Sequence, residues 1–224
     1  MSLEAALRAA LPTDMAVACV PIDVTHPPLF PAEEAAMAKA RPMRRQEFAA
    51  GRACARQALA AVGGPAVAIP VAEDRRPLWP NGYVVAITHK GAWAAAIAGP
   101  AERYAGLGLD LETDEPLPAG VAGGICLPEE LAEGASLTLQ YGRLLDRGKL
   151  TFVAKETLFK AYYPTALHFL DFPDARVAFG PDAGTFATEL MRADAPSRAE
   201  RRQFQGRFGW AEDMLFAVMV VGGL

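Results

Sequence analysis

The chain has few cysteines and no long hydrophobic run. Its 224 residues include only three cysteines, which stand far apart at positions 19, 54 and 126, so the sequence indicates neither a disulfide framework nor a CxxC metal site. No uninterrupted apolar run approaches the roughly 18 residues that a membrane-spanning helix needs. Pro12 and Asp14 interrupt the N-terminal segment before a secretory core forms. We therefore expect a cytoplasmic protein without a membrane span.

The chain also lacks a basic excess and the common nucleotide-binding loops. Its 22 Lys and Arg against 26 Asp and Glu give a net charge of −4, so no surplus of cations exists to neutralise a nucleic-acid backbone. Neither a GxxxxGK[ST] loop nor a GxGxxG motif occurs, which excludes the P-loop and Rossmann modes of phosphate binding. We expect no nucleic-acid partner, and any phosphate site must be built from separate basic elements.

The order of helical and strand patterns predicts an α+β protein built from two halves. In the first half we expect strands at Met15–Ile22, Tyr83–Thr88 and Ala92–Ala98 and helices at Ala32–Ala40 and Met43–Ala61. In the second half we expect a helix at Phe152–Pro164, strands at Ala175–Phe179, Thr185–Met191, Gln203–Trp210 and Met214–Val221, and a polar loop at Asp194–Arg202. Because helices are followed by strands twice, we divide the chain into an N-terminal α+β half, residues 1–113, and a C-terminal α+β half, residues 114–224.

The most regular alternation in the chain places two carboxylates on one face of a predicted strand. From residue 106 to residue 112, three leucines point to one side and Gly106, Gly108, Asp110 and Glu112 to the other. A solvated acidic face would explain this pattern, but neighbouring like charges repel unless a cation lies between them, and hard oxygen ligands suit Mg²⁺. We favour a metal site, with the two glycines leaving room for a ligand to approach the backbone.

The predicted helix Phe152–Pro164 is apolar or aromatic over most of its surface and still carries three charges, Lys155, Glu156 and Lys160. Such a helix is normally buried, and buried Lys and Glu are rare unless they are paired. A Glu156–Lys160 pair at i, i+4 would stabilise the helix by a few tenths of a kcal/mol. The alternative is that the charged residues belong to a functional site.

Arginines form a stripe along the predicted helix Met43–Ala61. Arg45, Arg52 and Arg56 lie at i, i+7 and i+11, and Arg44 lies just beside them. A solvated arginine face is the usual explanation of such a pattern. The alternative is an anion clamp, because planar guanidinium groups match phosphate oxygens two at a time.

Further basic groups stand in a loop and at a strand end. The turn-rich segment 73–82 carries Arg75 and Arg76, and His89 follows the predicted strand Tyr83–Thr88, where it is better placed for chemistry than a core histidine. Together with the three carboxylates, these groups suggest a metal-plus-phosphate site. Three oxygen ligands with open positions are how proteins hold Mg²⁺ for a diphosphate substrate.

Four segments of the chain resemble the 4′-phosphopantetheinyl transferases, in the family's order and at similar spacing. They are Arg44–Arg56, Arg76–His89, Gly108–Glu112 and Phe152–Ala161. The branch that the chain is most similar to is the enterobactin-synthase-component-like, or surfactin-type, branch, which includes actinobacterial polyketide-activating enzymes. Residues 165–224 carry no comparable motif, although Trp210 and the last strand are in keeping with the family.

The resemblance implies transfer of the phosphopantetheine arm of coenzyme A to a serine of an acyl, peptidyl or polyketide carrier protein, with 3′,5′-ADP as the other product. The fold it implies is α+β, a pseudo-twofold pair of α/β subdomains with the active site in the cleft between them. Such enzymes serve fatty-acid, polyketide, nonribosomal-peptide or siderophore biosynthesis. Coenzyme A is then the substrate, the metal is Mg²⁺ with Mn²⁺ as a substitute, and we expect a monomer.

The resemblance also implies roles for individual residues. The metal ligands would be Asp110, Glu112 and Glu156. The groups that meet the 3′-phosphate would be Arg44 and Arg52, those around the adenosine end Arg75 and Arg76, and those that contact phosphate groups Thr88, His89, Lys155 and Lys160. As catalytic residues, Glu156 would take the proton of the serine hydroxyl, alone or through a metal-bound water, and Lys160 would stabilise charge on the leaving phosphate.

Three positions depart from the family pattern without removing a ligand. Ala86 stands where a serine is common, Lys90 where a cysteine is common, and Leu111 where isoleucine or alanine is common; we expect Leu111 to face the core. Two other functions stay open: another Mg²⁺-dependent diphosphate-cleaving enzyme that needs no carrier, and a non-catalytic coenzyme A or nucleotide-binding module. The second should have lost an acidic ligand or Lys160, and this chain has lost neither.

Overall fold

The helices and strands follow the expected order along the chain. The structure is a computed structural model that describes residues 1–134, 136–138, 144–180, 184–192 and 202–223. The helices are α1 Leu3–Ala9, α2 Pro31–Ala36, α3 Pro42–Ala61, α4 Ala122–Ile125, α5 Pro128–Ala132 and α6 Arg147–Ala166, with a 3₁₀ turn at Phe172–Asp174. The strands are β1 Ala16–Pro21, β2 Tyr83–Lys90, β3 Trp93–Pro100, β4 Tyr104–Thr113, β5 Ser136–Thr138, β6 Leu144–Asp146, β7 Ala175–Phe179, β8 Thr185–Leu190, β9 Gln203–Ala211 and β10 Met214–Gly222. The polar loop expected at Asp194–Arg202 lies outside the described residues except for Arg202.

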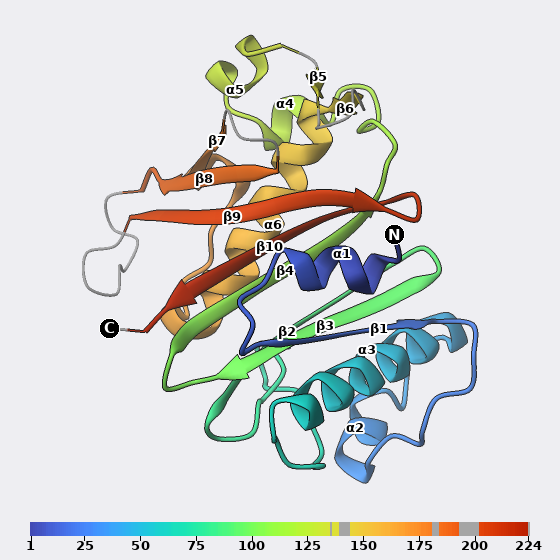
Figure 1. The fold of residues 1–224 in the computed structure, drawn as a ribbon. Coiled ribbons are helices and arrows are strands. Elements are labelled where there is room, and N and C mark those ends of the chain that lie inside the picture. Colours follow the sequence, from blue (N-terminus) through green and yellow to red (C-terminus); the bar gives the residue numbers. More distant parts are fainter. Residues whose placement is uncertain (135, 139–143, 181–183, 193–201, 224) are drawn as a thin grey trace.

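The strands of the described residues form two main sheets (Figure 1), which confirms the expected α+β class. The first sheet has the order β1-β3-β2 and the second the order β4-β10-β9-β8-β7, and all neighbouring strands are antiparallel. Strand β4 therefore belongs to the second sheet, so the change from one sheet to the other falls between β3 and β4. The division into two halves at residue 113 stays a prediction.

Helices cover the outer faces of the two sheets, and a further core fills the space between the sheets. Helix α3 packs on the first sheet and α6 on the second, and Figure 1 shows α6 behind the five-stranded sheet. Between the sheets, Leu109 and Leu111 of β4 pack with Leu7 of α1 and Ile97 of β3. The expected core position of Leu111 is confirmed, and its neighbours on β4 must face α6 on the other side.

Two glycines bring β4 and α6 into backbone contact. A Cβ atom on Gly106 or Gly108 would lie under 3.0 Å from the backbone carbonyl oxygen of Ala161 or Thr157 in α6. The space that these glycines leave is therefore filled by the helix, and the expectation that a ligand approaches the backbone there is wrong. The close contact instead places the acidic face of β4 directly against α6.

We expect Gly108→Ala to destabilise the protein, because the added methyl group would meet the backbone of Thr157 and force β4 away from α6. Overpacking of this kind costs about 1–3 kcal/mol and occasionally more, which thermal unfolding followed by circular dichroism would measure. Gly123→Ala is the matched control, since nothing lies within 4 Å of a Cβ atom there. An unfolding midpoint for Gly108→Ala equal to that of the wild type would contradict the described packing.

Helix α6, Arg147–Ala166, is longer than the helix Phe152–Pro164 predicted from the sequence. Asp146 caps its first turn by accepting a hydrogen bond from the backbone N–H of Lys149 at 2.7 Å. The helix continues past Pro164 to Ala166 and ends at Leu167, whose backbone is left-handed with φ 51°. The expected stop near Pro164 is thus early by two residues. Among the described residues no helix, α6 included, has the length and hydrophobicity needed to cross a membrane.

Candidate active site

Strands β2 and β4 and helix α6 bring a threonine, an aspartate and a lysine together. The hydroxyl of Thr88 donates to Oδ1 of Asp110 at 3.2 Å and accepts from the backbone N–H of Leu111 at 3.3 Å. Nζ of Lys160 donates to the same Asp110 oxygen at 2.6 Å. Lys160 therefore pairs across to β4 and not with Glu156 on its own helix, so the simple i, i+4 pair does not explain these charges.

Glu112, the second carboxylate of β4, is held between two lysines. Nζ of Lys90, at the end of β2, lies 3.0 Å from Oε1, and Nζ of Lys149, in the first turn of α6, lies 3.0 Å from Oε2. The sequence interpretation missed Lys149, although it stands seven residues before Glu156 and so on the same side of the helix two turns earlier. Lys90, a departure from the family pattern, now has a definite partner.

Glu156 is the third carboxylate and forms no ion pair among the described residues. Burial raises the pKa of Glu156, the negative charges of Asp110 and Glu112 raise it further, and Lys160 opposes both. Burial also raises the pKa of Asp110, and the ammonium group of Lys160 opposes this most strongly. The three predicted carboxylates thus lie near enough to repel one another.

The three carboxylates supply the hard oxygen donors that Mg²⁺ prefers. As the side chains stand, no three His, Cys, Asp or Glu residues in the described part of the chain are close enough together to hold a metal ion. The lysines neutralise Asp110 and Glu112 instead. The donor set therefore fits a divalent cation in its chemistry, and the three carboxylates would have to come closer together to hold one.

A cavity of about 740 Å³ opens beside this cluster, between α3, the loop before β2, β2 itself and α6. Its volume falls within the roughly 300–1,000 Å³ typical of small-molecule sites. The predicted phosphate-binding residues that line it are Arg44, Arg52, Arg75, Arg76, His89 and Lys160. Phe159 and Phe169 also border a smaller cavity of about 200 Å³ that Glu156 lines. The fold thus gathers basic side chains from four separate elements around one cavity.

His89 is held at the edge of the cavity by Arg44 and Glu47. Nη1 of Arg44 donates to Nε2 of His89 at 2.8 Å, and Nδ1 of His89 lies 3.9 Å from a carboxylate oxygen of Glu47. Burial lowers the pKa of His89, and the positive charges of Arg44 and Lys160 lower it further against the effect of Glu47. The imidazole is therefore neutral at neutral pH and accepts a hydrogen bond from the arginine.

Only part of the predicted arginine stripe reaches the cavity. Arg45 pairs with Glu34 at 2.5 Å and Arg56 with Glu33 at 2.9 Å, so these two arginines hold α2 against α3. Arg52 is buried and still lines the cavity. Burial lowers the pKa of Arg52 to about 10 and the charge of Glu33 opposes this, which leaves the guanidinium protonated at neutral pH.

Lys155 is not brought to the cavity, contrary to the expected phosphate contact. Its ammonium group is buried and donates to Oε2 of Glu130 at 2.9 Å and to the backbone carbonyl oxygens of Ile125 at 2.8 Å and Phe172 at 2.9 Å. All three N–H groups are used within the protein. Lys155 is thus directed toward α4, α5 and the 3₁₀ turn, and like Glu156 it lines only the smaller cavity of about 200 Å³.

Two family models match most of the chain. The model described as the 4′-phosphopantetheinyl transferase N-terminal domain matches residues 32–99. The model described as the 4′-phosphopantetheinyl transferase superfamily matches residues 106–217. The two matches meet between β3 and β4, where the chain also passes from the first sheet to the second.

Three relatives are similar over most of their length. The chain is 39% identical to the 4′-phosphopantetheinyl transferase Svp of Streptomyces mobaraensis over 86% of this chain and 78% of the relative. It is 38% identical to Npt of Nocardia iowensis over 72% and 74%, and 32% identical to PptT of Mycobacterium tuberculosis over 72% and 72%, both also named 4′-phosphopantetheinyl transferases. The chain therefore belongs to the 4′-phosphopantetheinyl transferase superfamily.

Proposed function

We propose that this protein transfers the 4′-phosphopantetheine arm of coenzyme A to a serine of an acyl, peptidyl or polyketide carrier protein and releases 3′,5′-ADP. The observation that carries the proposal is that the arginine-lined cavity reaches Lys160, whose ammonium group is bound to the carboxylate cluster. Cleaving a diphosphate needs both features, because cations must neutralise phosphate charge while acidic groups hold a metal or take a proton. The names of the three relatives support the same reaction.

We place the adenosine end of coenzyme A among the arginines of the cavity. Arg44 and Arg52 would meet the 3′-phosphate, and Arg75 and Arg76 would surround the adenosine. The pyrophosphate would extend toward His89, Thr88 and Lys160, where β2 meets α6. Lys155 has no part in this arrangement, because its ammonium group is fully used in a buried contact.

Mg²⁺, with Mn²⁺ as a substitute, would be held by Asp110, Glu112 and Glu156. A bound ion would neutralise charge on the pyrophosphate. Lys90 and Lys149 each pair with one oxygen of Glu112, and each oxygen keeps a further lone pair with which it could bind a cation.

Glu156 is the group that we assign to the proton of the carrier serine. It has no ion pair among the described residues and its pKa is raised, and both features make it a better proton acceptor than a carboxylate neutralised by lysine. Lys160 would donate to the leaving phosphate, because its ammonium group already lies at the junction of the cavity with β4.

Four further points from the sequence belong to this proposal. We propose that the enzyme falls in the enterobactin-synthase-component-like branch, and that its two α+β halves divide near residue 113. We also propose that it is a monomer that acts in the cytoplasm, where coenzyme A and carrier proteins of fatty-acid, polyketide, siderophore or nonribosomal-peptide biosynthesis would meet it. These points rest on the sequence and on its resemblance to the family.

The test is a mass measurement on an apo carrier protein incubated with coenzyme A, MgCl₂ and this protein. Transfer adds about 340 Da, the mass of the phosphopantetheine arm. A carrier whose acceptor serine is replaced by alanine is the control and should keep its mass. Chelation of the metal with EDTA should abolish the shift.

The two alternatives give different outcomes in the same experiment. Release of 3′,5′-ADP without any carrier would favour another diphosphate-cleaving enzyme. Binding of coenzyme A, measured by calorimetry, without release of 3′,5′-ADP and without modification of any carrier would favour a non-catalytic binding module.

A further inference from the structure

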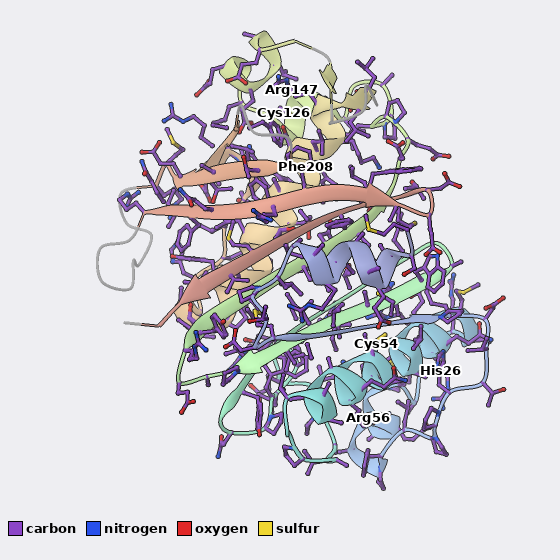
Figure 2. The ribbon with its side chains drawn as sticks, viewed as in Figure 1. His26, Cys54, Arg56, Cys126, Arg147 and Phe208 are labelled. Atoms are coloured by element: carbon purple, nitrogen blue, oxygen red, sulfur yellow. The ribbon has the colours of Figure 1, made fainter. Side chains whose placement is uncertain are left out.

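Glu33 is a buried carboxylate that neither the sequence patterns nor the proposed reaction uses. Its side chain has no exposed surface. Its oxygens accept from both the Phe30 backbone N–H at 2.9 Å and the Ile69 backbone N–H at 2.8 Å, and Nη1 of Arg56 donates to both of them at 2.9 and 3.1 Å. Figure 2 labels Arg56 on α3. A buried charge needs such partners, but these contacts reach beyond holding α2 in place.

Glu33 also fixes the arginine that reaches the cavity. Its Oε1 lies 4.0 Å from Nε of Arg52, and that Nε donates to the backbone carbonyl oxygen of Ile69 at 3.0 Å. The same Ile69 backbone is held through its N–H by Glu33. The guanidinium of Arg52 lies over the ring of Phe48 at 4.1 Å. Carboxylate, carbonyl and ring together restrict the orientation of the guanidinium.

The ends of the Arg52 side chain stay free to bind a ligand. Among the described residues, no protein group accepts a hydrogen bond from the two Nη atoms of Arg52. Neither Nη atom is among the buried polar atoms that lack a partner, and Arg52 lines the 740 Å³ cavity. A planar guanidinium held at Nε presents its two Nη groups as a fork that matches two oxygens of one phosphate. Arg52 is thus a preformed phosphate ligand whose orientation depends on Glu33.

The charge of Glu33 also offsets repulsion within the arginine stripe. The positive charges of Arg56 and Arg44 act on Arg52 against its protonated form, and Glu33 acts in its favour. Oε1 of Glu33 lies 4.0 Å from Nε of Arg52 and 2.9 Å from Nη1 of Arg56. Without this carboxylate, two buried like charges would face each other and Arg52 would be pushed toward solvent.

We propose that Glu33 is a positioning residue for recognition of the 3′-phosphate of coenzyme A, acting through Arg52 and the Ile69 backbone. The inference rests on the proposed function, which supplies coenzyme A as the substrate, and adds a residue from α2 to its binding. Glu33 touches no part of the substrate. Its effect is therefore confined to how well the protein distinguishes coenzyme A from dephospho-coenzyme A, which lacks the 3′-phosphate.

The experiment measures the ratio of dissociation constants for dephospho-coenzyme A and coenzyme A by calorimetry in wild type and Glu33→Gln. We expect the ratio to fall about tenfold in the variant, as for the loss of one good charge-assisted contact, through weaker binding of coenzyme A alone. Glu34→Gln is the matched control, because Glu34 lies on the same helix and pairs with half-buried Arg45, and neither residue lines the cavity. Its ratio should equal that of the wild type.

A double-mutant cycle separates positioning from a general structural effect. In an Arg52→Gln background, Glu33→Gln should leave the ratio unchanged, because its effect passes through Arg52. A further fall of the ratio in the double variant would overturn the proposal. So would a ratio in Glu33→Gln alone that equals that of the wild type. Arg56→Gln keeps the inference testable if Glu33→Gln does not fold. This variant keeps the carboxylate of Glu33 beside Arg52, so the ratio of dissociation constants should equal that of the wild type, and a lower ratio would overturn the proposal.

Failure of this inference is distinguishable from failure of the proposed function. Carrier modification by the wild type with an undiminished ratio in Glu33→Gln would leave the transferase proposal standing and remove the role of Glu33. A wild-type protein that does not bind coenzyme A would overturn both.

Discussion

Glu156→Gln should abolish carrier modification while leaving the binding of coenzyme A nearly unchanged. Glu156 is the carboxylate that no lysine neutralises among the described residues. It lies near Asp110 and Glu112 and lines the smaller cavity of about 200 Å³. Replacing it by an amide removes both a metal ligand and a proton acceptor, so we expect the transfer rate to fall by at least about 10²-fold. Single-turnover mass spectrometry on an apo carrier measures the rate, and calorimetry measures coenzyme A binding.

The stability of the same variant is the control, and we expect it to change in the opposite direction. Because the folded-state pKa of Glu156 is raised, the stability that its protonated form contributes is fully present below the unfolded-state pKa and is lost as the pH rises through the folded-state value. In metal-free protein at neutral pH, glutamine should therefore raise the unfolding midpoint. The gain should vanish below the ordinary glutamate value of 4.5.

The transfer rate and the unfolding midpoint of Glu156→Gln can each contradict the roles assigned to Glu156. Transfer at nearly the wild-type rate with Mg²⁺ present would contradict both the base and the ligand assignments of Glu156. A lower unfolding midpoint at neutral pH would instead mean that the substitution damages the fold, and would contradict the repulsion among the three carboxylates.

The elements that carry the site were predictable because each has its own periodic signal. The alternation from Gly106 to Glu112 determines which side chains of β4 share a face, and the structure places its leucines in the core between the sheets and its acids against α6. The hairpin of β9 and β10 likewise follows from an alternating run, a short turn and a continuous apolar run. Local pattern fixes such elements because the period of a strand does not depend on its partner.

The pairing of charges could not be predicted in the same way. Lys155 and Lys160 both stand on α6 among aromatic residues, and nothing local says which of them faces the cavity. The partner of Lys155 is Glu130, 25 residues earlier, and that of Lys160 is Asp110, 50 residues earlier. Long-range packing decides such contacts. The role of Glu33 could not be predicted from the sequence for the same reason, since its partners are Arg56 of α3 and Ile69, 36 residues later.

Lys155→Met should lower the stability of the protein strongly and leave coenzyme A binding intact once the protein is folded. The Lys155–Glu130 pair is buried, with both side chains about 3% exposed. Glu130 would still accept hydrogen bonds from the backbone N–H groups of Leu127 at 2.6 Å and Val177 at 2.5 Å. It would lose its only ion pair among the described residues. Breaking one side of a buried pair costs about 3–5 kcal/mol, or about 10 °C in unfolding midpoint for a chain of this size.

The double variant Lys155→Met/Glu130→Gln tests the cause of this loss. The amide oxygen of glutamine can still accept from one backbone N–H group without leaving a buried charge, so we expect part of the stability to return. Lys39→Met, at an exposed lysine, is the matched control and should change stability by no more than about 0.5 kcal/mol. If Lys155→Met weakened coenzyme A binding and left the unfolding midpoint unchanged, the lysine would contact phosphate after all. The structure predicts the reverse, because every N–H group of this ammonium already has an acceptor in α4, α5 or the 3₁₀ turn that precedes β7.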